Sequence, residues 1–169
     1  MKTFLKIAVA LILLVAILAA AGYAWASSAA AEAMEQTVEV RTVDFPVPYP
    51  EAETAGDDGA ASEGDAAAVD PRAAAAARGE HLVRARYGCA DCHGDNLGGG
   101  VMMDAMPMGR FLGPNLTGGS GSVTADYASA DWDRAVRHGV APDGRRLMMP
   151  AEDFQMMSDQ ELADIVTYI

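Results

Sequence analysis

The pentapeptide Cys89-Ala90-Asp91-Cys92-His93 contains both cysteines of this 169-residue chain and one of its three histidines. Two thiols at this spacing, starting at the end of a helix, can reach two neighbouring vinyl groups on one edge of a porphyrin. The imidazole that follows directly is then placed over the central iron. Cys-x-x-Cys-His is the attachment pattern of haem c. The motif therefore predicts one covalent haem c, with thioethers from Cys89 and Cys92 and with His93 as an axial iron ligand.

Three other roles for the two cysteines fit the sequence less well. A thioredoxin-like dithiol lies between a strand and a helix, whereas a helix is expected before Cys89. A structural zinc ion needs four ligands, and Cys89, Cys92 and His93 with either His81 or His138 lack the usual zinc-finger spacing. A disulfide between the two cysteines would close too small a ring to stabilise the fold much.

Methionine is a common partner of histidine on the haem iron of electron-carrying cytochromes c. The chain has ten methionines, so position has to distinguish them. Met149, before Pro150, lies far enough after His93 for the chain to reach the opposite face of the haem, and it is the predicted sixth ligand. Met148 is the main alternative and Met106 a weaker one. The remaining candidates are expected to pack loosely around the macrocycle: Met102, Met103, Met108, Met156 and Met157.

Residues 1–26 read as a membrane anchor or an export signal. Lys2 and Lys6 precede 20 uncharged residues from Ile7 to Ala26, enough for a helix to cross a hydrocarbon core of about 30 Å. Ala24-Trp25-Ala26 also fits the cleavage pattern of a signal peptide, so both interpretations stay open. Either way the basic end stays in the cytoplasm. We expect a single-pass protein of the cytoplasmic membrane with its folded domain on the periplasmic side.

Residues 27–69 are predicted to be a flexible, acidic linker rich in alanine, proline and glycine. No apolar period persists there, so the segment cannot offset the entropy cost of folding. Thr37 to Val43 alternates enough to extend as a strand, and Pro46 to Pro50 favours polyproline II. We interpret this strip either as a stiff spacer or as a surface that docks on a partner subunit. As a coil, about 43 residues would span roughly 35–40 Å and tether a mobile domain.

Residues 70–169 are the predicted folded domain. Asp70-Pro71 provides an N-cap and a proline at the first helical position. The helix that starts there should continue to about Tyr87 and end at Gly88.

The rest of the domain also shows helical signals. A short helix is expected over 130–138, and a last one begins at Ser158, where Ser158 and Glu161 match a capping box. Residues 94–128 form a loop region rich in glycine, methionine and proline, and we expect no strands or hairpins after residue 70. The predicted fold class is all-α.

The charge of the chain limits its partners. It has 24 acidic and 12 basic residues, a net charge of −12. Phosphate binding needs a basic surface, so a nucleic-acid partner is excluded.

Several short motifs after residue 72 occur in the order seen in the class I monohaem cytochromes c, and the chain resembles this family. It is especially similar to the periplasmic, often membrane-anchored cytochromes found as dehydrogenase subunits or near terminal oxidases. The resemblance covers about residues 72 to 169. The motifs are Arg78-Gly79-Glu80-His81-Leu82-Val83, Tyr87 to Gly94, Gly113 to Thr117, Arg134 to Val140, Asp143-Gly144-Arg145, Met149-Pro150 and Leu162 to Tyr168.

The resemblance implies a small cytochrome c fold whose first and last helices cross at Gly79, against Tyr168 or Ile165. It also implies that the carbonyl of Pro114 accepts a hydrogen bond from His93, which orients the imidazole.

The resemblance also bears on the haem propionates and on the end of the chain. Trp132, Arg137 and Arg145 are candidates for positions near the propionates. The alternative is that Trp132 fills the core and that the arginines are solvated helix ends. Family members usually continue past the equivalent of Tyr168, so we expect a longer chain than one ending at Ile169.

These observations predict a one-electron carrier with a His/Met-ligated haem, and not an enzyme with a small-molecule substrate. One hypothesis is a membrane-tethered carrier between respiratory or dehydrogenase partners. A second is a fixed cytochrome c subunit of a larger membrane respiratory or oxidoreductase complex. A third is a haem enzyme or sensor with a labile sixth ligand.

Overall fold

The computed structural model describes residues 2–50, 70–106 and 109–169. The chain divides into two compact units, one of Met1–Glu39 with Asp143–Arg146 and one of Val40–Pro142 with Leu147–Ile169. We describe each unit by itself.

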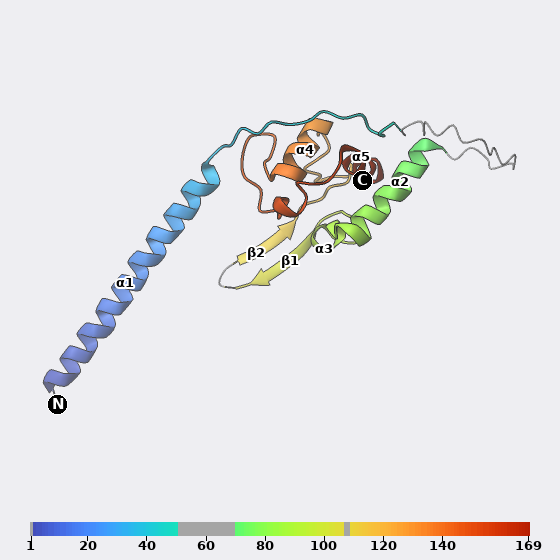
Figure 1. The fold of residues 1–169 in the computed structure, drawn as a ribbon. Coiled ribbons are helices and arrows are strands. Elements are labelled where there is room, and N and C mark those ends of the chain that lie inside the picture. The colour runs from blue at the N-terminus through green and yellow to red at the C-terminus, as the bar shows by residue number, and fades with distance from the viewer. Residues whose placement is uncertain (1, 51–69, 107–108) are drawn as a thin grey trace, which may run out of the picture. The chain divides into compact units, whose positions relative to one another are not determined.

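The first unit consists mainly of one long helix, α1 (Lys2–Glu35), which is long and apolar enough to cross a membrane (Figure 1). It continues nine residues past the predicted boundary at Ala26, because the alanine-rich stretch that follows has high helix propensity. After it, Thr37 forms a β-bridge with Arg145. The backbone N–H of Val38 donates to the carbonyl of Gly144 at 2.8 Å.

The second unit contains the predicted helices. The helix expected from Pro71 to about Tyr87 is present as α2 and a π-helical turn, η1. The short helix expected over 130–138 and the last helix are also present. Their bounds are α2 (Pro71–His81), η1 (Leu82–Arg86), α3 (Cys89–His93), α4 (Ser129–His138), η2 (Ala151–Asp153) and α5 (Asp159–Tyr168).

The predicted caps of α2 and α5 are confirmed. Asp70 accepts a hydrogen bond from the N–H of Arg72 at 3.0 Å. At the start of α5, the N–H of Glu161 donates to the Ser158 hydroxyl at 3.2 Å, and the N–H of Ser158 donates to the Glu161 carboxylate at 2.9 Å. Both helix starts follow from residues within three positions of the cap, so the sequence alone specifies them.

The prediction that no hairpin follows residue 70 is wrong. Strands β1 (Gly100–Ala105) and β2 (Gly109–Gly113) pair in an antiparallel hairpin, visible in Figure 1. A register shift between Val101 and Met103 interrupts the pairing. A bulge of this kind breaks the alternation of apolar and polar residues by which strands are identified in a sequence. The unit is therefore mostly helical, as predicted, with one small hairpin.

The helices α2 and α5 cross at Gly79, as the resemblance implied. A methyl group on Gly79 would lie 2.0 Å from the carbonyl oxygen of Asp164 and 2.8 Å from the Cβ of Tyr168. Beside this contact, the guanidinium of Arg78 binds the Asp164 carboxylate with two hydrogen bonds of 2.7 and 2.9 Å. The absence of a side chain at Gly79 therefore lets the two backbones approach.

Part of the predicted linker is not a linker. Phe45 is only 5% exposed and belongs to the core of the second unit with Leu82 and Trp132. The N–H of Val43 donates to a carboxylate oxygen of Asp133 at 2.8 Å. A single phenylalanine in a stretch without apolar periodicity gives no sequence signal, because its burial depends on a pocket formed by residues far along the chain.

Candidate haem-binding site

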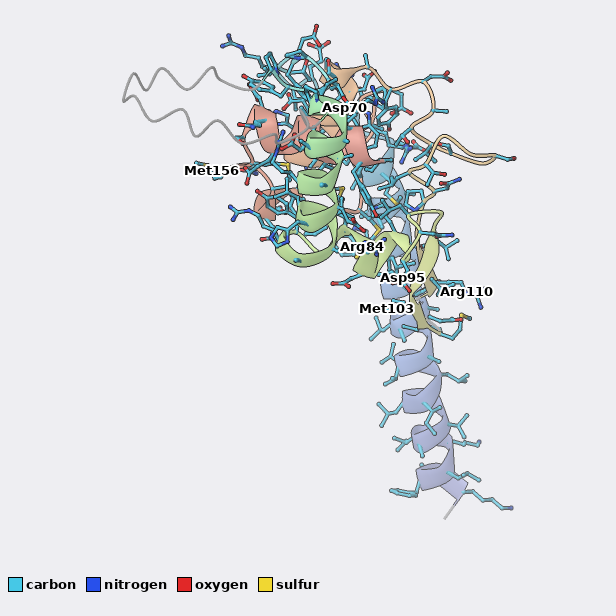
Figure 2. The ribbon with its side chains drawn as sticks, turned by 90° about the vertical axis from the view of Figure 1, so that its right-hand side faces the viewer. Asp70, Arg84, Asp95, Met103, Arg110 and Met156 are labelled. Carbon is cyan, nitrogen blue, oxygen red and sulfur yellow. The ribbon has the colours of Figure 1, made fainter. Side chains whose placement is uncertain are left out.

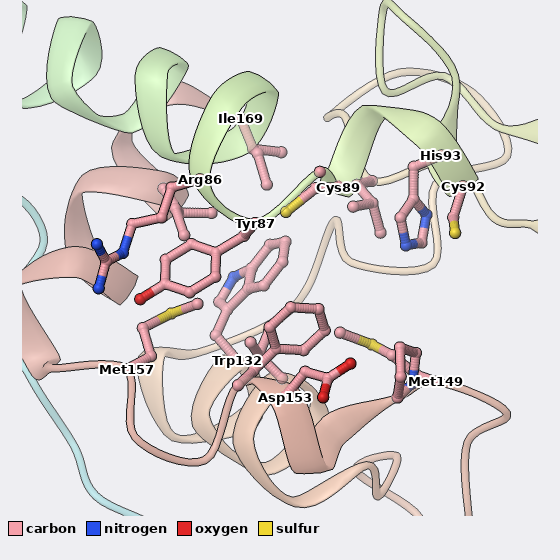
Figure 3. A pocket seen from close by; sticks show the side chains of 16 residues that line it. Arg86, Tyr87, Cys89, Cys92, His93, Trp132, Met149, Asp153, Met157 and Ile169 are labelled. Carbon is pink, nitrogen blue, oxygen red and sulfur yellow. The ribbon is translucent and has the colours of Figure 1, made fainter.

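A cavity of about 580 Å³ lies in the second unit (Figure 3). Its volume falls within the usual range of 300–1,000 Å³ for cofactor sites. Both cysteines and His93 line it from α3, and Trp132 lines it from α4. Apolar side chains from α5 and the preceding loop complete the wall, among them Phe154, Met157 and Ile165.

The two cysteines are free thiols, each partly buried. Burial raises the pKa of Cys89, so this thiol is held in its neutral form. A redox-active dithiol needs a lowered pKa and an exposed thiolate, and Cys89 has neither. Among the residues that the structure describes, no group of three or more His, Cys, Asp or Glu side chains is arranged to hold a metal ion. The geometry thus favours neither the dithiol nor the zinc interpretation.

The ring of His93 is oriented by its neighbour, as the resemblance implied. Its Nδ1 lies 2.9 Å from the carbonyl oxygen of Pro114, so Nδ1 is the protonated donor and Nε2 is left for an iron ligand. Pro114 comes directly after β2. At the end of that strand, a methyl group on Gly113 would lie 1.9 Å from the carbonyl oxygen of Cys92. The hairpin, which the sequence analysis did not predict, therefore packs on α3. The residue that follows it, Pro114, provides the carbonyl that accepts the hydrogen bond from His93.

Met149 lines the cavity, and Figure 3 shows its side chain pointing into the cavity across from His93. Its neighbour Met148 is 74% exposed and does not line the cavity, and Met106 is 80% exposed. Of the three alternatives for the sixth ligand, the structure brings only Met149 to the same cavity as His93.

The other methionines are distributed differently from the prediction. Met157 lines the cavity as expected. Met103 lies on the outer surface of the hairpin, and Met156 is 94% exposed (Figure 2). Met102 is also exposed and does not line the cavity. The prediction for Met108 lies outside the described residues. The prediction that the side chains of Met102, Met103 and Met156 pack around the cofactor is therefore wrong.

Arg137 is not brought to the cavity. It does not line the cavity, and it is 7% exposed, so it is not a solvated helix end either. Its guanidinium lies 2.8 Å from carboxylate oxygens of Asp133 and Asp159. The structure thus pairs Arg137 with two acidic residues and does not place it among the cavity-lining residues, and its predicted cofactor contact stays a prediction. Arg145 does not line the cavity, whereas Trp132 both lines it and belongs to the core.

Arg86 is a cavity residue that the sequence analysis missed. Its guanidinium lies 5.3 Å from the centre of the Tyr87 ring and 3.2 Å from the Glu161 carboxylate. The side chain is 59% exposed, so it is an accessible cation among the cavity-lining residues that can meet an anionic group. In the sequence, its position three residues before Cys89 could have indicated that Arg86 lies beside the cofactor site.

The ionised carboxylate of Glu161 should stabilise the domain at neutral pH, and this stabilisation should be lost in acid. Burial alone would raise the pKa of Glu161, but hydrogen bonds from Ser158 and Tyr87 and the charge of Arg86 hold that pKa below its usual range. A lowered pKa stabilises the folded state above the unfolded value of about 4.3, and this stability is lost as the pH falls through the folded pKa. We expect Glu161→Gln, which keeps the capping box, to cost less than about 1 kcal/mol at pH 7.

Urea unfolding at pH 7 and at pH 3 measures this effect. The difference in the free energy of unfolding between the unmodified protein and Glu161→Gln should be smaller at pH 3 than at pH 7. Glu152→Gln, at an exposed position, controls for the change of net charge. An unchanged difference at both pH values would show that ionisation of Glu161 does not contribute.

Residues 74–169 match the family described as cytochrome C oxidase, cbb3-type, subunit III. The chain is also 36% identical over 97 residues to the gluconate 2-dehydrogenase cytochrome c subunit of Pantoea cypripedii. It is 30% identical over 99 residues to the fructose dehydrogenase cytochrome subunit of Gluconobacter japonicus. These matches cover 54% of this chain in both cases, and 22% and 20% of the two relatives. The chain thus spans about a fifth of the length of these relatives.

Proposed function

The chain belongs to the cbb3-type cytochrome c oxidase subunit III family of c-type cytochromes, and on this premise we propose that it carries single electrons through one His/Met-ligated haem c. The observation that carries the proposal is the cavity that holds Cys89, Cys92, His93 and Met149 together. When bound there, haem iron supplies the one-electron change between the ferrous and ferric states.

The residues of the cavity have distinct roles in this proposal. Cys89 and Cys92 hold the cofactor by thioethers, which keeps it in place in both oxidation states. His93 ligates the iron through Nε2, and Pro114 keeps the imidazole in the tautomer that leaves this nitrogen free. Met149, which points into the cavity across from His93, would be the second iron ligand. Because His93 and Met149 would both ligate the iron, no coordination site would remain for a substrate, which supports electron transfer and not a haem enzyme or sensor.

The position in the cell is part of the proposal. The helix α1 is long and apolar enough to anchor the chain in a membrane. Lys2 and Lys6 at its start favour a cytoplasmic N-terminus and an extracytoplasmic haem domain. Two relatives are named as cytochrome subunits of dehydrogenases. This supports a role in which the chain receives electrons from a dehydrogenase or another respiratory protein, as a carrier or as a subunit.

Haem staining after a denaturing gel, followed by absorption spectra of the oxidised and reduced protein, tests the proposal. We expect a stained band, a sharp reduced spectrum and the weak red band of a methionine–iron bond. The double variant Cys89→Ala/Cys92→Ala should give no stained band and serves as the control. Absence of staining in the unmodified protein would overturn the haem assignment. Staining without the red band would overturn the His/Met ligation.

A further inference from the structure

A short segment that follows α1 in the sequence binds to α4 within the second unit, and we call residues 40–49 the strap. The N–H of Val43 donates to the carboxylate of Asp133 at 2.8 Å. The hydroxyl of Ser129 donates to the carboxylate of Asp44. Both partners of the strap belong to α4, so two hydrogen bonds fix the strap on this helix.

The strap also contributes to the core of the second unit. Phe45 is 5% exposed and belongs to the same buried cluster as Trp132 and Leu82, and Tyr49 packs against that cluster. Aromatic side chains provide the largest apolar surfaces that a single residue can bury. The strap is therefore held by an apolar contact as well as by hydrogen bonds.

The strap and the cavity meet neighbouring faces of the same helix. Positions 129, 133 and 137 of α4 repeat every four residues, so they share one face of the helix. Two of these positions, 129 and 133, bind the strap. Trp132 and Val136 are also four residues apart, and both line the cavity. A contact of the strap can therefore set the position of the cavity wall through one rigid helix.

The carboxylate of Asp133 is arranged to receive the strap. Its side chain is 1% exposed, and one of its oxygens accepts from Arg137 at 2.8 Å. The other oxygen accepts the N–H of Val43 at 2.8 Å, whereas Nε2 of His138, at 3.6 Å, is too distant for a hydrogen bond. A buried carboxylate oxygen without a donor is costly, so α4 binds the strap more favourably than it would without Asp133.

We propose that the strap is part of the haem site, where it clamps α4, holds Trp132 in the cavity wall and keeps water from the iron; this rests on the proposed function. Trp132 is 7% exposed, lines the cavity and shares the buried cluster with Phe45. Phe45 and Asp133 do not line the cavity themselves, so they are positioning residues. The family match starts at residue 74, and the strap thus lies outside the part of the chain that it covers.

The expected consequence is a higher reduction potential of the haem. An environment without water disfavours the more highly charged state of a buried group, which for haem iron is the ferric state. Solvent access and the apolar shell around a metal site are known determinants of its potential. Release of the strap should therefore admit water and favour the ferric form.

Two pairs of variants of the full-length haem protein test the proposal. Phe45→Ala removes the buried ring, and Phe45→Leu keeps most of its apolar volume. Val43→Pro removes the N–H that Asp133 accepts, and Val43→Ala keeps it. Val47→Ala changes an exposed side chain of the strap and is a further control. Redox titration measures the potential of each variant, after haem staining and urea unfolding have shown that it is loaded and folded.

We expect Phe45→Ala and Val43→Pro to shift the equilibrium between ferric and ferrous haem about tenfold toward the ferric form. For one electron this lowers the midpoint potential by about 59 mV. Phe45→Leu, Val43→Ala and Val47→Ala should keep the potential of the unmodified protein. The red methionine–iron band should persist in every variant, because the change is in the cavity wall and not in the iron ligands.

A second measurement tests whether the strap acts through Trp132. In a Trp132→Phe background, Phe45→Ala should shift the equilibrium by less than about threefold, because two residues that act together give non-additive effects. A further tenfold shift in that background would show that the strap acts by another route, and the proposal would be wrong.

A strap that only stabilises the fold would give a lower free energy of unfolding in Phe45→Ala and Val43→Pro with an unchanged potential, which would overturn the proposal. Loss of the red band together with the fall in potential would contradict it as well, since a ligand would then have changed. If Phe45→Ala does not fold, the pair at position 43 decides. Failure of the proposed function is distinguishable, because the unmodified protein would then lack covalent haem stain or the red band.

Discussion

Replacing Met149 with alanine is expected to lower the midpoint potential of the haem by on the order of 100 mV or more, since axial ligand identity tunes haem potentials over about 0.8 V. A thioether ligand favours the ferrous state, and its loss removes that preference. The weak red methionine–iron band should disappear, and the reduced haem should bind carbon monoxide at the vacated position. Redox titration and absorption spectra of the purified protein measure all three effects.

Two other methionines provide matched controls for Met149. Met148→Ala changes the neighbouring residue, which is 74% exposed, and should leave the potential and the red band unchanged. Met157→Leu changes a side chain that lines the same cavity but conserves its apolar volume, so the red band should also persist. Loss of the red band in Met148→Ala or Met157→Leu, with Met149→Ala unaffected, would reassign the sixth ligand.

Replacing Gly79 with alanine is expected to destabilise the haem domain by about 3 kcal/mol. The added methyl group would lie 2.0 Å from the carbonyl oxygen of Asp164, which is backbone and cannot rotate away. α2 and α5 would have to separate, and this would disturb the paired Arg78 and Asp164. The loss outweighs the roughly 1 kcal/mol that alanine gains over glycine inside a helix.

Thermal and urea unfolding measure the effect of Gly79→Ala, and a melting temperature lower by roughly 10 °C or more is expected for a domain of this size. Ala77→Gly is the control at an exposed position of α2, where only helix propensity changes, by about 1 kcal/mol. If Gly79→Ala were neutral or stabilising, the close crossing of the two helices would not be a determinant of stability.

The sequence by itself determined the features that depend on neighbouring residues. Cys89, Cys92 and His93 act as one chemical unit within five positions, so their spacing is enough to predict haem attachment. The caps at Asp70 and Ser158 are equally local, because each side chain bonds a backbone group two or three residues away. These predictions needed no knowledge of how the chain folds back on itself.

Only the tertiary structure decided which residues meet across the chain. Met148 and Met149 are adjacent and chemically identical, and burial against a cavity built from distant elements distinguishes them. Arg137 had the right charge for a propionate, but Asp133 and Asp159 already bind it. The composition around Phe45 indicates a free linker, yet one aromatic side chain finds a pocket beside α4. In each case a contact between residues far apart in the sequence takes part, for Arg137 the one with Asp159, and local patterns do not record such contacts.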